Sequence, residues 1–279
     1  MESFNRLVDN ILNLYRFVSQ LPFGTVVSYV FISSVTVLLL IVALSALRTP
    51  SFDYRGKHVL VTGGSSGIGL EAAKEYARLG ADVTIVARDM KKLATAADIL
   101  YPIVNKHGRK VVVISLDTGV GQEQVTAALK NIPPVDVLLN CAGTSVAGAF
   151  DDLDASEFER MMRVNLLGSV YPTRAVLAGM KRNCSNSNSN SKSSGGGGGL
   201  GGGGGGGRIV FVASQVAQAA IHGYTAYAAS KWALRGLAEA LQMEVKPFGI
   251  LVSVCYPPDT DTPGYKVRRN NNRNNNRKE

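Results

Sequence analysis

The sequence predicts an α/β protein whose parallel β-sheet is covered by α-helices on both faces and is preceded by an N-terminal transmembrane helix. Two patterns indicate this. From Lys57 onward, short runs rich in Val, Ile and Leu alternate with stretches of helical periodicity, which is typical of parallel strands buried on both faces. Before them, residues 17–47 carry no charged side chain, and a helix over residues 26–47 is long enough to cross about 30 Å of hydrocarbon.

The elements expected after Lys57 alternate between strand and helix. Strands are predicted over 58–63, 81–88, 110–117, 135–143, 208–214 and 250–257. Helices are predicted over 66–80, 89–104, 122–131, 156–181 and 225–245. This order is that of a doubly wound sheet, in which helical crossovers join parallel strands.

Composition marks four further segments. Residues 1–25 carry apolar side chains at helical spacing, as in an amphipathic helix on a membrane or an extension of the anchor. Residues 26–47 are the predicted anchor, and a cleaved signal peptide is the alternative. Within the α/β domain at 57–264, the Ser/Asn/Gly-rich stretch 183–207 is expected to be a loop insertion. The basic Asn/Arg tail 265–279 is expected to be disordered.

Charge and cysteine content exclude several classes of protein. The 279 residues are 46% hydrophobic and 18% charged, with a net charge of +9, which allows a large buried core. Much of that charge lies in the tail, so the sequence gives no reason to expect nucleic acid as a partner. The remainder suits a nucleotide phosphate or an anionic lipid. Three cysteines without a CxxC pair argue against a disulfide framework or a zinc site, and no metal is expected.

A glycine-rich turn, TGGSSGIG at 62–69, lies directly between the first predicted strand and the first predicted helix. In this context Gly63 permits a tight turn, Gly67 lets the backbone approach a pyrophosphate, and Gly69 allows close packing of the helix. Backbone N–H groups and the positive end of the helix dipole then face the phosphates. The predicted dinucleotide-binding turn of this Rossmann-type fold comprises Gly63, Ser65, Ser66, Gly67, Ile68 and Gly69.

The end of the second predicted strand favours NADPH over NADH. Folds that bind NAD usually place an acid there to hold the adenosine ribose, but this sequence has Ala87 followed by Arg88. A guanidinium can pair with the 2′-phosphate of NADPH. The alternative is a solvated arginine at a strand end, and Asp89 directly after it leaves that alternative open.

The sequence TAYAASK places Tyr227 and Lys231 on one face of a predicted helix, downstream of a strand that ends at Ser214. Reduction of a ketone needs a hydride for carbon and a proton for oxygen. Tyr227 is the predicted proton donor, because the Lys231 ammonium is expected to lower the pKa of the phenol from its usual value of about 10. Ser214 is expected to hydrogen-bond the carbonyl oxygen as charge develops.

These motifs, together with NCAG at 140–143 and Asn165 in MMRVNLLG, resemble the short-chain dehydrogenase/reductase family over most of residues 57–264. The resemblance implies a catalytic tetrad of Asn165, Ser214, Tyr227 and Lys231. In that family the Asn helps to hold a proton-relay water, and the Lys also holds the nicotinamide ribose. The further cofactor-binding residues that it implies are Asp117 on the adenine side, Thr262 at the nicotinamide carboxamide, and Asn140, Ala142, Gly143 and Pro257.

Four longer stretches, VNLLGSVYPTRAV, RIVFVASQ, RGLAEALQMEVKP and YPPDTDTPG, are similar to those of a group within that family, the 3-ketodihydrosphingosine reductases. The similarity implies NADPH-dependent reduction of 3-ketosphinganine to sphinganine, with a long-chain sphingoid ketone and membrane lipid as partners. It also implies a location in the endoplasmic reticulum membrane with the catalytic domain facing the cytosol. Homo-oligomer formation stays open.

Two alternatives stay open as well. One is a membrane-anchored short-chain reductase that acts on a steroid, a retinoid or a fatty acyl ketone. The other is a nucleotide-binding protein without turnover, because the family's lid helix and seventh strand are not visible after residue 264. The sixth strand is then expected to lack an outer neighbour, and the substrate pocket to lack one wall.

Overall fold

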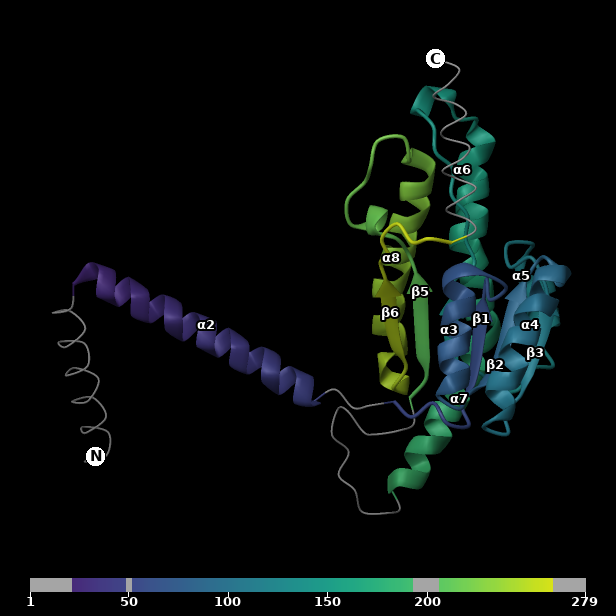
Figure 1. Ribbon diagram of the computed structural model, residues 1–279, viewed down its shortest axis with the longest axis horizontal. Helices are drawn as coiled ribbons and strands as arrows, with labels where there is room; N and C mark the ends of the chain where they lie inside the picture. The colour runs from purple at the N-terminus through teal and green to yellow at the C-terminus, as the bar shows by residue number, and fades with distance from the viewer. Residues whose placement is uncertain (1–21, 49–51, 193–205, 263–279) are drawn as a thin grey trace. The chain divides into compact units, whose positions relative to one another are not determined.

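The computed structural model describes residues 22–48, 52–192 and 206–262, which belong to two compact units, 1–51 and 52–279 (Figure 1). Within residues 22–48, the described part of the first unit forms the helix α2 (Phe23–Arg48), which confirms the helical conformation predicted for 26–47. Its large apolar side chains between Val27 and Val42 are exposed. Within the described ranges, no helix has both the length and the apolarity that crossing a membrane requires, so the predicted crossing is not found there.

Parts of three other predicted segments cannot be compared with the structure. Most of the N-terminal segment 1–25, residues 193–205 of the expected loop insertion, and all of the tail 265–279 lie outside the described residues.

The second unit contains a six-stranded parallel sheet in the order β3-β2-β1-β4-β5-β6, which confirms the predicted doubly wound architecture. Its central strand is fully buried, because β-branched and leucine side chains point into the cores on both faces. The strands are β1 (His58–Thr62), β2 (Asp82–Ala87), β3 (Val111–Ser115), β4 (Val137–Asn140), β5 (Arg208–Val212) and β6 (Leu251–Cys255).

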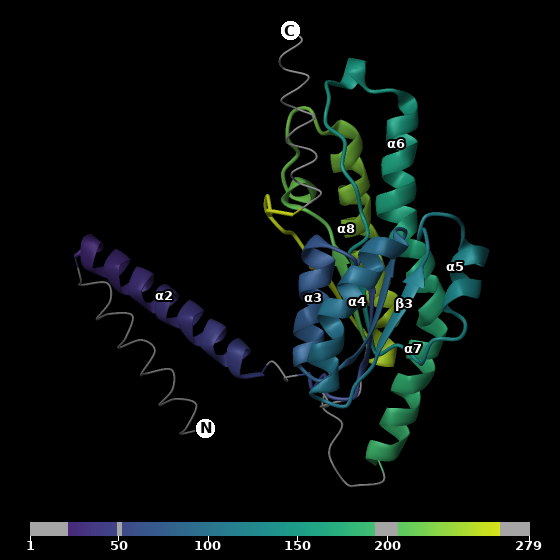
Figure 2. The same cartoon turned by 45° about the vertical axis from the view of Figure 1, so that its right-hand side comes forward.

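Two hydrophobic cores lie on opposite faces of this sheet, since successive residues of each strand point to opposite sides. On one face, Val59 and Val61 pack with α3 (Gly67–Arg78) and α4 (Met90–Asn105), which lie side by side in Figure 2. On the other face, Leu60 belongs to the core formed with α5 (Gln122–Leu129), α7 (Gly168–Lys192) and α8 (Thr225–Val245).

The helix predicted over 156–181 differs from the prediction in two ways. It consists of α6 (Ala155–Met161), a π-helical stretch over Met162–Leu167, and α7, which continues to Lys192. The last turns of α7 therefore include the Ser/Asn part of the stretch expected to be a loop. Between Lys181 and Lys192 there is no Pro or Gly. Ser and Asn destabilise a helix by only about 0.5 kcal/mol per residue relative to Ala, so they can continue it.

The topology fixes where a ligand can bind. Successive crossovers lead from β1 outward to β2 and β3, and then back to β4 on the other side of β1. Loops at the carboxyl ends of β1 and β4 therefore diverge and leave a crevice, which is where open α/β sheets bind their ligands. The glycine turn follows β1, the NCAG segment overlaps the end of β4, and Ser214 follows β5.

Candidate active site

A cavity of about 550 Å³ lies at the carboxyl ends of the strands. It brings together fifteen of the seventeen site residues expected from the sequence. Those residues are Gly63, Ser65, Ser66, Gly67, Ile68, Gly69, Arg88, Asp117, Ala142, Gly143, Ser214, Tyr227, Lys231, Pro257 and Thr262. The other two, Asn140 and Asn165, do not line it and lie buried behind its wall.

The glycine turn is shaped by contacts that leave no room for side chains. Gly63 adopts φ +68° and donates its N–H to the Val86 carbonyl at 2.8 Å, and a Cβ on it would lie 2.8 Å from the Ala142 nitrogen. A Cβ on Gly69 would lie only 2.3 Å from the Gly63 carbonyl oxygen. The roles predicted for these glycines are thus the ones the backbone requires.

The start of α3 fits an anionic ligand. Its first turn contains no acidic residue, and the Ser66 side chain makes no capping hydrogen bond among the described residues. The first N–H groups of a helix have no intrahelical acceptor, and they carry the positive end of the helix dipole. The turn therefore presents donors to the cavity in the arrangement that binds phosphate groups.

Thr62, which was not predicted as a site residue, fastens the turn after β4 to the turn after β1. Its Oγ1 accepts hydrogen bonds from the backbone nitrogens of Cys141 and Ala142, both at 3.1 Å. A threonine at the end of a strand gives no signal of this role in the sequence, because the role depends on which strand becomes its neighbour.

Lys231 and Tyr227 lie one turn apart on α8, as predicted. Lys231 is 5% exposed, its Nζ donates to the Val212 carbonyl at 2.9 Å, and the same Nζ lies 5.8 Å from the centroid of the Tyr227 ring. Burial lowers the pKa of Lys231 to about 8, which the Coulombic influence of Cys141 partly opposes. At pH 7 most of the Lys231 population still carries a proton, so a cation lies next to the tyrosine.

Cys141 lines the same cavity but is not a nucleophile at neutral pH. Burial raises the pKa of its thiol to about 11, although Lys231 acts in the opposite direction. The thiolate is the reactive form of cysteine, and very little of it exists at pH 7.

Ser214 follows β5 and begins the short 3₁₀ turn Gln215–Ala217. Its half-buried hydroxyl accepts a long hydrogen bond from the Val216 nitrogen at 3.4 Å and lines the cavity together with Tyr227. The hydroxyl hydrogen remains available for an acceptor in the cavity, because the hydroxyl accepts rather than donates in this bond.

Asn165 supports the wall of the cavity from behind. It is fully buried, its Oδ1 accepts from the Thr144 nitrogen at 2.8 Å, and its Nδ2 donates to the Thr144 carbonyl at 3.0 Å and to Ser230 Oγ at 2.8 Å. A Cβ on Gly143 would lie 3.1 Å from Asn165 Oδ1 and 3.5 Å from Lys231 Nζ. Asn165 and Lys231 thus both approach Gly143, but Asn165, which was predicted as a catalytic residue, does not itself line the cavity.

The π-helical stretch that contains Asn165 was not predicted. Single π turns inside helices are frequent at functional sites, because the extra residue redirects one side chain. Here the stretch contains Asn165, whose side chain makes both hydrogen bonds to Thr144. Hydrophobic periodicity alone carries little trace of one added residue.

Asn140 holds α7 against the sheet. Its buried Nδ2 donates to Thr173 Oγ1 at 3.0 Å, while its Oδ1 has no partner among the described residues. Asn140 was predicted as a cofactor-binding residue, but its buried side chain points to α7 and does not line the cavity.

At the adenosine end, the cavity is lined by Arg88, which was predicted, and by Lys92, which was not. Both side chains are exposed. Between them, Asp89 caps α4, because its Oδ1 accepts from the backbone nitrogens of Lys91 at 2.9 Å and Lys92 at 3.1 Å. The Asp89 carboxylate, whose charge would oppose binding of a 2′-phosphate, is therefore hydrogen-bonded to the start of α4.

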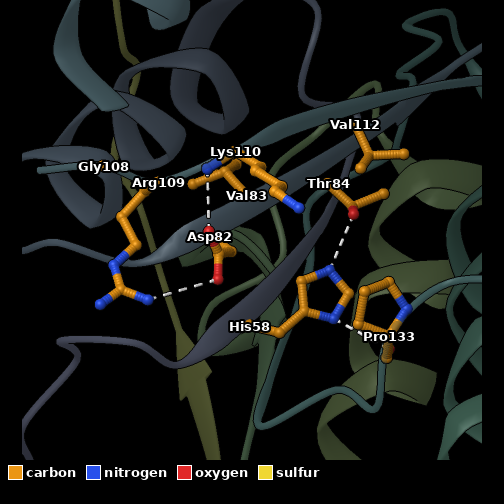
Figure 3. Close-up of a pocket in the computed structure, with 9 residues that line it drawn as sticks. All are labelled: His58, Asp82, Val83, Thr84, Gly108, Arg109, Lys110, Val112 and Pro133. Carbon is orange, nitrogen blue, oxygen red and sulfur yellow. Dashed lines mark hydrogen bonds and ion pairs between the residues drawn. The ribbon is translucent and has the colours of Figure 1, made fainter. Parts of the chain in front are cut away.

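A second cavity, of about 340 Å³, lies at the other end of the strands, where β1, β2 and β3 begin (Figure 3). His58 Nδ1 contacts the Pro133 carbonyl at 2.9 Å and Nε2 contacts Thr84 Oγ1 at 2.8 Å. A carbonyl can only accept, so Nδ1 carries the proton, and burial lowers the pKa of His58. The Asp82 carboxylate accepts from the Lys110 nitrogen at 2.8 Å. These polar groups hold loops together.

The comparisons with known proteins agree with this geometry. The family model of short chain dehydrogenases matches residues 57–273. The chain is 45% identical over 236 residues to "3-dehydrosphinganine reductase" of Danio rerio, covering 83% of this chain and 65% of that protein. It is 46% identical over 238 residues to "3-ketodihydrosphingosine reductase" of Bos taurus, covering 84% of this chain and 65% of that protein. The chain thus spans just under two thirds of the length of these relatives.

Solved structures show the same fold. The L-sorbose reductase from Gluconobacter frateurii, complexed with NADPH and L-sorbose, matches with a TM-score of 0.62 and 27% identity, over 75% of this chain and 72% of that one. The 3-ketoacyl-(acyl-carrier-protein) reductase from Brucella melitensis, complexed with NADH, matches with a TM-score of 0.64 and 25% identity, over 76% of this chain and 80% of that one. From the family match and the arrangement of its cavity, the chain belongs to the short-chain dehydrogenase family.

Proposed function

We propose that this protein is an oxidoreductase that uses NADPH to reduce 3-ketosphinganine to sphinganine. The observation that carries the proposal is that Ser214, Tyr227 and Lys231 line one cavity with the glycine turn. The choice of substrate is supported by the relatives from Danio rerio and Bos taurus, at 45% and 46% identity.

The residues of the cavity fit a nicotinamide dinucleotide. The backbone of the glycine turn and the start of α3 would hold the pyrophosphate, and Arg88 with Lys92 would hold the 2′-phosphate of NADPH. Asp117 would contact the adenine side, Lys231 the nicotinamide ribose and Thr262 the carboxamide. When bound, the cofactor supplies a hydride to the carbonyl carbon.

The protein's own groups handle the proton and the charge on oxygen. Tyr227 donates its hydroxyl proton to the ketone oxygen, which becomes the alcohol as the carbon gains its hydride. The Ser214 hydroxyl donates a hydrogen bond to the same oxygen while negative charge develops on it. The Lys231 cation, 5.8 Å from the tyrosine ring centroid, stabilises the phenolate that remains. Asn165 keeps the Gly143–Thr144 wall in place.

The proposal includes a location at the endoplasmic reticulum membrane, with the catalytic unit in the cytosol. Association with a membrane is supported by the apolar side chains of α2, of which large ones such as Phe31, Leu39 and Ile41 are each more than half exposed. Exposed apolar surface of this extent is unfavourable in water and favourable in lipid. Carbonate extraction of microsomes and protease protection of the catalytic unit test association and orientation, respectively.

Turnover by the full chain in lipid vesicles tests the activity. We expect loss of nicotinamide absorbance together with formation of sphinganine, and Tyr227→Phe is expected to abolish both while leaving NADPH binding nearly unchanged. Reduction of a steroid, a retinoid or a fatty acyl ketone in place of 3-ketosphinganine would replace the proposed substrate. NADPH binding without reduction of any of these ketones would indicate a nucleotide-binding protein.

A further inference from the structure

The active-site cavity has carboxylates at both of its ends. Among the described residues that line it, the acids are Asp89, Asp117 and Asp259. The first two follow β2 and β3, at the adenosine end, and both accept hydrogen bonds from backbone N–H groups nearby. Asp259 follows β6, at the other side of the sheet. Asp259 therefore lines the cavity on the side of β5 and β6, where Ser214 also lies.

Two contacts fix the segment that carries Asp259. At its start, the Pro257 carbonyl accepts from the Gln215 nitrogen at 3.3 Å, which places it beside Ser214. At its end, Thr262 lies against the glycine turn, since a Cβ on Gly67 would be 3.1 Å from Thr262 Cγ2. The segment thus runs across the cavity from the serine to the turn.

A local hydrogen bond restricts Asp259 within this segment. Thr260 Oγ1 donates to the Pro258 carbonyl at 2.8 Å, closing a small turn around the aspartate. Pro258 has a fixed φ, which restricts the backbone further. Asp259 is thus presented by a constrained segment that lines the cavity, although its side chain is exposed to solvent.

The proposed substrate has a charge that matches this position. In 3-ketosphinganine the carbon next to the ketone carries an amino group, which is a cation when protonated. With the ketone oxygen at Tyr227 and Ser214, this ammonium would lie on the same side of the cavity as Lys231, a buried cation that would repel it. A carboxylate on the same side of the cavity offsets that repulsion and pairs with the ammonium.

From this we infer that Asp259 is a specificity-determining residue, which pairs with the ammonium of a 2-amino ketone and so selects amino ketones over neutral or anionic ketones. The inference rests on the proposed function and deepens it. Asp259 has no part in the chemical step, so its effect is on which ketone is reduced.

The test compares two substrates and two variants of the full chain in lipid vesicles. The substrates are 3-ketosphinganine and its des-amino analogue, which keeps the ketone, the hydroxyl and the alkyl chain. Asp259→Asn removes the charge at the cavity. Asp261→Asn removes the same charge two residues away, at an exposed side chain that does not line the cavity.

We expect Asp259→Asn to lower kcat/KM for the amino ketone by about tenfold and to leave the des-amino analogue within about twofold, because only one substrate loses a charge partner. Asp261→Asn is expected to change neither, and Asp259→Glu to keep part of the preference. An NADPH titration of each variant shows whether the cavity is intact.

The outcomes separate this inference from the proposed function. If the wild-type chain reduces 3-ketosphinganine but Asp259→Asn affects both substrates equally, the inference is wrong and the proposed function stands. Equal effects of Asp259→Asn and Asp261→Asn on the amino ketone would likewise overturn it, since general electrostatics would then be the cause. If the wild-type chain binds NADPH and reduces no amino ketone, the proposed function fails, and the inference fails with it.

Discussion

Single side chains at the adenosine end of the cavity are expected to set the choice of cofactor. Arg88→Ala and Lys92→Ala should each weaken NADPH binding by about three- to tenfold and leave NADH nearly unchanged, because only NADPH has the 2′-phosphate that they can pair with. Lys91→Ala is the matched control, since Lys91 is exposed and does not line the cavity. Fluorescence titration with both cofactors measures the ratio. An equal loss of NADH affinity would remove Arg88 and Lys92 as selectors.

Lys231 is expected to make the stability of the protein depend on pH. Its pKa is about 8 in the folded protein and 10.5 as the ordinary value, so between these values the unfolded chain binds more protons. The free energy of unfolding contributed by this group therefore rises with pH in that window, by about 1.4 kcal/mol per pH unit at most. Below about pH 8 the full cost of the buried charge is present.

The variant Lys231→Met isolates this effect, because methionine has a similar length and does not titrate. Denaturant unfolding of both proteins at pH 7 and pH 9 gives the comparison. We expect the free energy of unfolding of the wild type, relative to that of the variant, to be higher at pH 9 than at pH 7. Parallel pH profiles of the two proteins would show that the burial of Lys231 does not shift its proton affinity.

At the scale of the helices, the glycines differ in whether they tolerate substitution by alanine. Gly69→Ala should destabilise the protein by several kcal/mol, roughly 3 or more, since its Cβ would lie 2.3 Å from a backbone oxygen of the glycine turn. Gly236→Ala, in the middle of α8 and exposed, should instead stabilise it by about 1 kcal/mol, because no atom lies within 4 Å of the new Cβ. Thermal unfolding of the two variants checks the contrast, and a loss of stability on Gly236→Ala would contradict it.

The same elements show what the sequence could predict. Each strand was identified because a buried parallel strand is a short, continuous apolar run, and Tyr227 with Lys231 was found because four residues make about one helical turn. Neither the π turn at Asn165 nor the role of Thr62 could be found in this way. Both depend on contacts between segments distant in the chain, such as Asn165 with Thr144 and Thr62 with Cys141. Lys92 and Asp259 belong to the same class, since only the folded chain brings them to the cavity.

At the scale of the whole molecule, an aromatic cluster at the start of the second unit is expected to stabilise its fold. Phe52 and Tyr54 have ring centroids 4.8 Å apart, and Tyr54 lies 5.3 Å from Tyr76 on α3. The Arg208 guanidinium lies 4.6 Å from the Phe52 ring centroid. This cluster ties the segment before β1 to α3 and β5. It lies at the amino-terminal ends of β1 and β5, whereas the active-site cavity lies at the carboxyl ends of the strands.

Two shortened chains test whether the unit is independent of α2. A chain that begins at Phe52 should bind NADPH with unchanged affinity, because every residue that lines the cavity belongs to the second unit. A chain that begins at Lys57 loses Phe52 and Tyr54 and should be less stable by about 1–3 kcal/mol, as aromatic pairs and their buried area predict. Thermal unfolding and NADPH titration separate the two effects. Loss of NADPH binding by a folded chain that begins at Phe52 would contradict the prediction. If it keeps binding but reduces a lipid ketone poorly in vesicles, then the helix acts by bringing the enzyme to its substrate.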